Sequence, residues 1–284
     1  MFSNGRARSG IIVLPCGAGK TLTGITAACT IKKSTLVVCT SQVSSEQWKR
    51  EFLKWSMVNP QDVLIFTSQT VKRTENKRQY SFLYEYKTQE QFDSKSLVLI
   101  CTYSMLSYSG TRTDTANEVM KFISNHDWGL MLLDEVQVVP AQKFSKITEN
   151  VKAHCKLGLT ATLVREDGKI DDLHFLIGPK LYEANWIDLQ DRGYLARVQC
   201  IEVWCEMTSE FYKEYYKSSG NYRLKEALYF NNPNKFMACH YLVKLHEARG
   251  DKIMIFCDHI FALMEYAVRL GIPYICGDVG ERER

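Results

Sequence analysis

Six short apolar runs, separated by longer segments with helical patterning, constrain the fold of this chain more than any other feature. Each run is nearly continuous rather than alternating in polarity, as is typical of parallel strands covered by helices on both faces. Strands and helices that alternate in this way build a doubly wound α/β fold, so we predict a mostly parallel sheet. The six predicted strands are residues 11–14, 36–39, 63–66, 97–101, 130–133 and 156–159.

One helix is marked by its own residues. Ser44 and Gln47 have the spacing of a capping box, and Trp48, Phe52 and Trp55 follow at intervals of one turn. We expect this aromatic stripe to pack in the core rather than to stack on nucleic-acid bases.

The composition narrows the class of protein. Hydrophobic residues make up 45% and charged residues 24%, which predicts a folded core, and the net charge of +4 is only a weak indication of a nucleic-acid partner. No stretch approaches 18 consecutive apolar residues, so we expect no membrane span. None of the ten cysteines has the spacing of a zinc site, and many lie in apolar runs. We therefore expect reduced thiols, no zinc and a reducing compartment.

The pattern changes after residue 178. We place the domain boundary shortly after this change, with a first domain over residues 1–187 and an incomplete second domain over residues 188–284. The polar, charged stretch from residue 71 to 95 is predicted to be a surface insertion. In the second domain we predict strands at 198–205, 252–257 and 272–276, helices at 236–248 and 261–270, and a tyrosine-rich helical pair at 210–230.

Residues 14–21 read Leu-Pro-Cys-Gly-Ala-Gly-Lys-Thr and connect a predicted strand to a predicted helix. Gly17 and Gly19 let the backbone wrap closely around phosphate oxygens, and the helix amino terminus presents N–H groups to an anion. Lys20 is placed to reach the terminal phosphates, and Thr21 to offer its hydroxyl to Mg²⁺. A chance glycine turn beside a lysine is the alternative, which the flanking strand and helix disfavour. We expect ATP to contact Pro15, Cys16, Gly17, Ala18, Gly19, Lys20 and Thr21.

Two carboxylates, Asp134 and Glu135, follow the predicted strand at residues 130–133. Acidic groups at the end of a buried strand are costly unless they hold a cation or a water molecule. Beside a phosphate loop, Asp134 would hold Mg²⁺, and Glu135 would orient and deprotonate the attacking water. The alternative is a strand-end turn with two solvated acids. The Asp134–Glu135 interpretation is strong only if this pair and Lys20-Thr21 meet at one metal.

A third motif, Thr160-Ala161-Thr162, ends another predicted strand. The motifs GAGKT, DEVQ and TAT occur in the order that is typical of superfamily 2 helicases. In those proteins the third motif couples the state of the bound ATP to nucleic-acid binding. The chain resembles the XPB-type DNA helicase family of transcription factor TFIIH in residues 6–21, 44–52, 102–106 and 128–130. The most specific similarity is residues 153–186, which include Arg165-Glu166-Asp167, and it argues against a restriction-type or repair translocase of the same superfamily.

The resemblance implies a RecA-like P-loop domain followed by the beginning of a second RecA-like domain with a thumb-like helical insertion. It implies an ATP- and Mg²⁺-dependent helicase that acts on DNA in the nucleus, with other TFIIH subunits as partners, in transcription initiation and nucleotide-excision repair. It also implies a DNA-coupling set made of Thr40, Ser41, Thr102, Ser104, Thr160, Thr162, Arg165, Glu166 and Asp167, alongside the catalytic residues Lys20, Asp134, Glu135 and Gln137.

This sequence departs from the family pattern at two places. Gln137 stands where the second motif of the family ends in histidine, and glutamine can exchange hydrogen bonds but cannot become charged. The family pattern also extends beyond both ends of this chain, including later motifs whose arginines stabilise the transition state. We therefore expect weak ATPase activity from these residues alone. A catalytically weak nucleotide-binding scaffold stays open as the alternative function.

Overall fold

The computed structural model describes residues 1–3, 5–73, 97–139, 141–162 and 170–277. Most of the predicted insertion lies outside the described residues, as do Arg165, Glu166 and Asp167. The chain divides into two compact units, residues 1–197 and 198–284, and each is described by itself. None of the described helices is long and apolar enough to cross a membrane.

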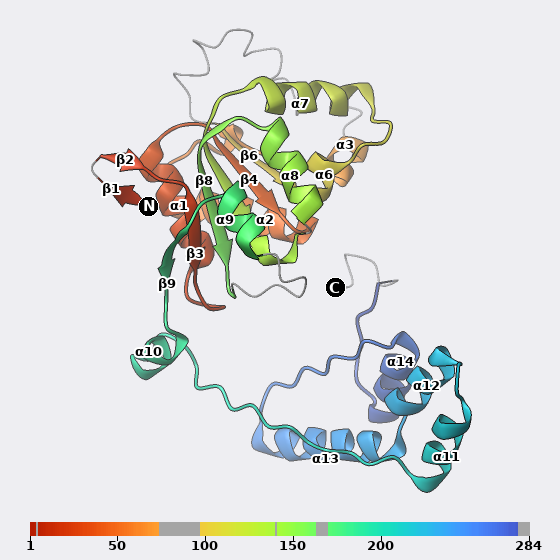
Figure 1. The fold of residues 1–284 in the computed structure, drawn as a ribbon. Helices are drawn as coiled ribbons and strands as arrows, with labels where there is room; N and C mark the ends of the chain where they lie inside the picture. Colours follow the sequence, from red (N-terminus) through yellow and green to blue (C-terminus); the bar gives the residue numbers. More distant parts are fainter. Residues whose placement is uncertain (4, 74–96, 140, 163–169, 278–284) are drawn as a thin grey trace. The chain divides into compact units, whose positions relative to one another are not determined.

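The first unit is built on a seven-stranded sheet in the order β5-β6-β4-β7-β8-β3-β9, in which every neighbouring pair is parallel (Figure 1). The α/β fold with a mostly parallel sheet is thus confirmed, and all six predicted strands are present. The pattern missed β9, a mostly exposed edge strand, and a small hairpin of β1 (Phe2–Ser3) and β2 (Arg6–Ala7). The sheet strands are β3 (Gly10–Val13), β4 (Thr35–Cys39), β5 (Val63–Phe66), β6 (Val98–Thr102), β7 (Trp128–Asp134), β8 (Ala153–Thr160) and β9 (Lys180–Glu183).

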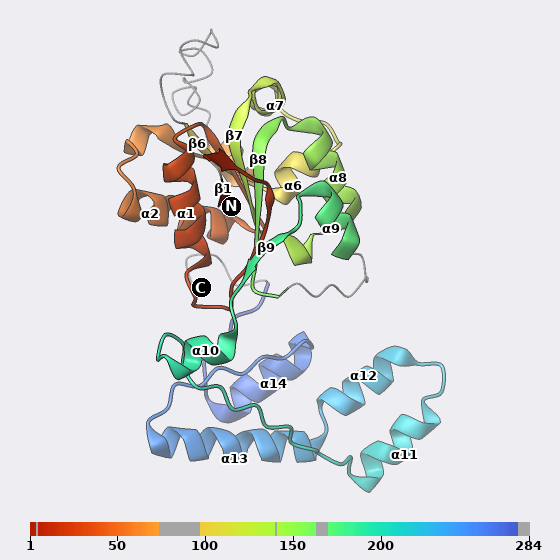
Figure 2. The same cartoon turned by 60° about the vertical axis from the view of Figure 1, so that its left-hand side comes forward.

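Helices cover both faces of this sheet (Figure 2). The helices α1 (Lys20–Ile31) and α2 (Gln42–Trp55) pack on one face, where Ile25, Trp48 and Phe52 join the strand residues in one apolar cluster. On the other face lie α6 (Tyr103–Ser107), α7 (Asp114–Asn125), α8 (Ala141–Asn150) and α9 (Ile170–Leu176). The central strands are buried on both sides, which explains their continuous apolar runs. Shorter elements are η1 (Pro60–Asp62), α3 (Ser68–Arg73), η3 (Val136–Val138) and α10 (Trp186–Asp191).

The predicted start of the aromatic helix was wrong by one turn. Helix α2 begins at Gln42, and its N-cap is Ser41, whose hydroxyl oxygen accepts the Ser44 N–H at 3.1 Å. Several serines here can cap a helix, and Ser41 is extended directly after β4, so it takes the cap and leaves the Ser44 side chain for another partner. The expected core packing is confirmed for Trp48 and Phe52, whereas Trp55, in the last turn, is 52% exposed.

The second unit is helical in its described residues. It contains α11 (Ser209–Lys217) and α12 (Tyr222–Phe230), which confirm the predicted helical pair, together with α13 (Pro233–Arg249) and α14 (Ile260–Leu270). The three strands predicted at 198–205, 252–257 and 272–276 do not form a ladder within the described part of this unit. A strand requires a hydrogen-bonded neighbour, whereas a helix satisfies its backbone locally, so an apolar run alone does not produce a strand.

The Asn232 side chain connects the start of α13 to the segment that precedes α11. This side chain is nearly fully buried; it donates to the carbonyl oxygens of Glu206 (3.0 Å) and Cys205 (3.3 Å) and caps α13 by accepting the Asn234 N–H (3.2 Å). We expect Asn232→Ala to lower the free energy of unfolding by about 2–3 kcal/mol, because it removes a helix cap and the two hydrogen bonds that a buried amide donates to the Cys205 and Glu206 carbonyl oxygens. Urea unfolding followed by circular dichroism checks this. Asn221→Ala, which removes an exposed cap from α12, is the control and should cost about 1 kcal/mol or less.

Candidate nucleotide-binding site

The loop between β3 and α1 has the backbone of an anion cradle. Gly17 and Gly19 both have left-handed backbone angles, with φ of 82° and 89°, which side chains rarely tolerate. The Ala18 N–H donates to the Pro15 carbonyl oxygen at 3.1 Å and closes the turn. Gly19 is the N-cap of α1, and no side chain among the described residues caps it. The helix amino terminus is therefore arranged for an external anion.

Lys20 and Glu135 bring the first two motifs together. The Lys20 ammonium lies 2.8 Å from Oε1 of Glu135, with 13% and 30% of the two side chains exposed. This contact follows from the strand order, because only β8 separates β3, which leads into the loop, from β7, which ends in Asp134. The carboxyl ends of parallel strands lie at the same edge of the sheet, so the loop and the acids share one site.

Asp134 accepts hydrogen bonds from three side chains. Its Oδ2 accepts the indole N–H of Trp48 at 2.8 Å and the hydroxyl of Ser44 at 3.4 Å, and its main-chain carbonyl accepts the Tyr103 hydroxyl at 2.9 Å. Burial raises the pKa of Asp134 above its ordinary value, and the Trp48 hydrogen bond partly offsets that effect.

Glu135 has an unusual backbone for its residue type, with φ of 50° in the left-handed region. Such a conformation costs of order 1–3 kcal/mol in a residue with a side chain and is concentrated at functional sites. Burial by itself raises the pKa of Glu135, but hydrogen bonds from Lys20 and Gln137 bring it below its usual value. The carboxylate is therefore ionised at neutral pH and paired with the lysine.

A line of hydrogen bonds runs from this pair to the third motif. Nε2 of Gln137 donates to Oε2 of Glu135 at 2.7 Å, and the Thr160 hydroxyl lies 2.6 Å from Oε1 of Gln137. The same hydroxyl lies 2.6 Å from the carbonyl oxygen of Thr162, and its single proton can be donated to only one of these acceptors at a time. Gln137 thus connects the acidic residue to the end of β8.

The residues expected to follow DNA lie at the same edge of the sheet. Thr40 and Ser41 follow β4, and Thr102 ends the neighbouring β6, where it pairs in register with Cys39. Thr102 caps α6 by accepting the Met105 N–H, and its hydroxyl lies 3.1 Å from that of Ser104. The structure therefore places the four hydroxyl residues of the two loops on adjacent strand ends.

Two family models together cover nearly the whole chain. Residues 2–165 match the type III restriction enzyme res subunit, and residues 189–284 match the ERCC3/RAD25/XPB C-terminal helicase. Curated relatives align over all 284 residues: the general transcription and DNA repair factor IIH helicase/translocase subunit XPB is 55% identical in Dictyostelium discoideum and 52% in Schizosaccharomyces pombe, and XPB/SSL2 is 52% identical in Saccharomyces cerevisiae. The chain belongs to the XPB helicase family. It spans about a third of the length of these relatives, with 31% of the Saccharomyces protein and 33% of the other two.

Solved helicase structures are more distant from this XPB-family chain. The Pyrococcus furiosus Hef helicase domain is 18% identical, with a TM-score of 0.49 over 93% of this chain and 54% of that one. The UvsW helicase of bacteriophage T4 is 14% identical, with a TM-score of 0.45 over 97% of this chain and 50% of that one.

Three residues beside the XPB-family motifs were missed as site residues. Trp48 was predicted to be only a core side chain, Ser44 was assigned to a helix cap, and Tyr103 was given no role of its own. A general physical rule pointed to the first of them, because a buried indole N–H needs an acceptor. The acceptor itself was not predictable, because residue 134 is far from residue 48 in the sequence.

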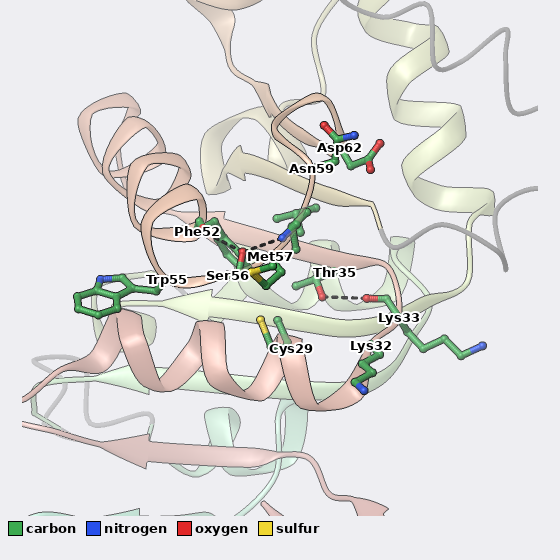
Figure 3. Close-up of a pocket in the computed structure, with 13 residues that line it drawn as sticks. Cys29, Lys32, Lys33, Thr35, Phe52, Trp55, Ser56, Met57, Asn59 and Asp62 are labelled. Atoms are coloured by element: carbon green, nitrogen blue, oxygen red, sulfur yellow. Dashed lines mark hydrogen bonds between the residues drawn. The ribbon is translucent and has the colours of Figure 1, made fainter.

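A separate hollow of about 630 Å³ lies at the opposite, amino-terminal edge of the sheet (Figure 3). It is lined by the end of α1, the end of α2 and the loop before β5, and contains Cys29, Trp55, Met57 and Asp62. None of the residues predicted for the XPB-family site lines this hollow. This hollow is therefore separate from the proposed nucleotide site.

Proposed function

We propose that this chain is the ATP-binding and DNA-coupling part of a TFIIH-type DNA helicase, which works in the nucleus by coupling ATP hydrolysis to DNA opening in transcription initiation and nucleotide-excision repair. Other TFIIH subunits and DNA are its proposed partners. One observation carries the proposal: Lys20, Glu135, Gln137 and Thr160 form a continuous line of contacts from the phosphate loop to the coupling motif.

The residues of the site fit an ATP–Mg²⁺ complex. Gly17 and Gly19 have left-handed backbone angles, and no side chain among the described residues caps α1. The loop therefore offers phosphates both space and free backbone N–H groups. Mg²⁺ is usually bound through one or two carboxylates together with water and substrate phosphates, so Asp134 and the Thr21 hydroxyl suffice for the protein's share. When bound, the metal would neutralise the charge that develops on the phosphate oxygens.

The contacts around Glu135 suggest what the chain's own residues do. Lys20 leaves Glu135 when a triphosphate offers it a stronger partner, and this frees the Glu135 carboxylate to orient the attacking water and accept its proton. Gln137 keeps its hydrogen bond to Glu135. A movement of the Glu135 carboxylate therefore shifts Gln137 and changes its hydrogen bond with Thr160. The left-handed backbone of Glu135 keeps its carboxylate directed at the loop.

Nucleotide binding by the purified 284-residue chain tests this proposal. We expect a fluorescent ATP analogue to bind in the presence of Mg²⁺, and we expect DNA with a single-stranded overhang to change its affinity. Binding of nucleotide without any response to DNA would favour the scaffold alternative. A chain that is folded by circular dichroism and binds no nucleotide would contradict the proposal.

Gln137→His is expected to change coupling while it leaves nucleotide binding intact. Gln137 contacts Glu135 and Thr160 through hydrogen bonds of 2.7 and 2.6 Å, and an imidazole has a different shape and can become charged, so we expect these bonds to change. Because one hydrogen bond contributes about 1 kcal/mol, we expect the DNA-induced change in nucleotide affinity or in ATPase rate to shift by about fivefold. The measurement compares basal and DNA-stimulated values for both proteins, and identical stimulation would refute the expectation.

A further inference from the structure

Asp134 is held from both faces of the sheet by side chains to which the sequence assigned no role at the site. On one face, Trp48 and Ser44 lie on α2 at i and i−4, so both side chains point from the same side of the helix to the same oxygen, Oδ2. On the other face, the Tyr103 hydroxyl in the first turn of α6 donates to the main-chain carbonyl of Asp134. The side chain and the backbone of this residue are thus fixed from opposite layers.

The Trp48 ring has little freedom to leave this arrangement. It is 1% exposed, its ring centroid lies 6.0 Å from that of Phe52, and it packs so closely on α1 that a Cβ added to Gly24 would come within 2.7 Å of it. A buried indole N–H without an acceptor would be costly, so packing and hydrogen bonding both direct it to Asp134.

The same two helices carry the hydroxyl residues of the strand ends at their amino termini. Ser41 caps α2, and Thr102 caps α6. Each helix therefore presents one cap at the edge where the DNA strand is proposed to run. Helix α2 also donates to the Asp134 carboxylate through Trp48 and Ser44, and α6 donates to the Asp134 main-chain carbonyl through Tyr103. Trp48 lies two turns after Ser41 on the continuous helix α2, and Tyr103 directly follows Thr102, so a displacement of either cap is carried to Asp134.

We propose that Trp48 and Tyr103 are positioning residues, which hold Asp134 from α2 and α6 so that the capping hydroxyls of Ser41 and Thr102 and the metal-binding carboxylate shift as one unit. This inference rests on the proposed function, because it takes Asp134 as a metal ligand and the strand-end hydroxyls as DNA contacts. It adds a physical route by which DNA engagement changes Mg²⁺–nucleotide affinity without passing through the third motif.

The test compares Trp48→Phe and Tyr103→Phe, which remove one donor each, with Trp128→Phe as the matched control. Trp128 is also fully buried, and its indole N–H donates to the Ile123 carbonyl oxygen at 3.0 Å, at the start of β7 rather than at its end. All three variants lose one aromatic hydrogen-bond donor from the core, but only the first two touch Asp134. Thermal unfolding verifies that each variant is folded, and Tyr103→Phe, which removes a single oxygen, remains informative if Trp48→Phe is unstable.

The readout is the affinity of the protein–ADP complex for Mn²⁺, measured by electron paramagnetic resonance, with and without an overhang duplex. Because residues that orient a metal ligand typically affect affinity by about 10–100-fold, we expect Trp48→Phe and Tyr103→Phe to weaken Mn²⁺ binding about tenfold. They should also lose the DNA-induced change, while metal-free ADP affinity stays as in the wild type. Trp128→Phe should retain all three values.

Mn²⁺ affinities in Trp48→Phe and Tyr103→Phe equal to those of the wild type would overturn this inference alone, because nucleotide binding would persist. The same losses in Trp128→Phe would also overturn it, because they would follow from core packing. A wild-type chain that binds no nucleotide would instead remove the proposed function, and this inference with it.

Discussion

Lys20→Ala is expected to lower the affinity of the chain for Mg²⁺–ATP by about 10–100-fold. A charge-assisted hydrogen bond to an anionic oxygen contributes about 1.5–3 kcal/mol, and each 1.4 kcal/mol corresponds to a factor of ten in affinity. The lysine is already at the site, because it pairs with Glu135 at 2.8 Å at the mouth of the phosphate loop. Part of its attraction for phosphate offsets the loss of that pair, which places the expected effect below that of an unpaired lysine.

Lys156→Ala is the matched control for this measurement. Lys156 is a half-buried lysine on β8 of the same sheet, but its ammonium donates to the Leu176 carbonyl oxygen at 3.2 Å, away from the loop. Titration with a fluorescent ATP analogue should give wild-type affinity for this variant. Equal affinities for Lys20→Ala and the wild type would show that the loop does not bind the terminal phosphates.

The sheet was predictable because its strands are buried on both faces. Residues such as Val37, Ile100 and Leu132 are fully covered by helices or neighbouring strands, so the sequence around them must be continuously apolar. The phosphate loop and the acidic pair were predictable for a related reason, because strand ends at one edge of a parallel sheet must converge. Their actual contact, Lys20 with Glu135, required only that β3 and β7 lie close together in the strand order.

The predictions that failed depend on distant partners or on competition between neighbouring residues. The segments at 198–205 and 252–257 have strand composition, but pairing decides whether a strand forms, and no pairing occurs in the described part of the second unit. The N-cap of α2 is Ser41 rather than Ser44, because several neighbouring serines can cap this helix. Trp48 looked like a packing residue because a sequence shows the ring but not the acceptor that its N–H reaches.

The roles of the individual site residues are predictions. A substitution of Glu135 distinguishes best between a role in nucleotide binding and a role in ATP hydrolysis. Its carboxylate accepts hydrogen bonds from Lys20 and Gln137 and is held at the loop by a left-handed backbone. A glutamine has the same shape and can still bond to Gln137. It cannot take a proton from water, however, and it does not attract the lysine as strongly.

Glu135→Gln is therefore expected to slow hydrolysis of bound ATP by about 10²–10⁴-fold, the usual contribution of a general base. Affinity for Mg²⁺–ATP should stay the same or rise, because Lys20 no longer has to leave a carboxylate before it meets the phosphates. Single-turnover hydrolysis of radiolabelled ATP with DNA present measures the first effect, and equilibrium titration measures the second. Glu183→Gln, an exposed glutamate paired with Lys180 on edge strand β9, is the control and should match the wild type in both. If Glu135→Gln reduced affinity and left the hydrolysis rate of bound ATP unchanged, Glu135 would be a binding residue, and the proton would have to be accepted by another group.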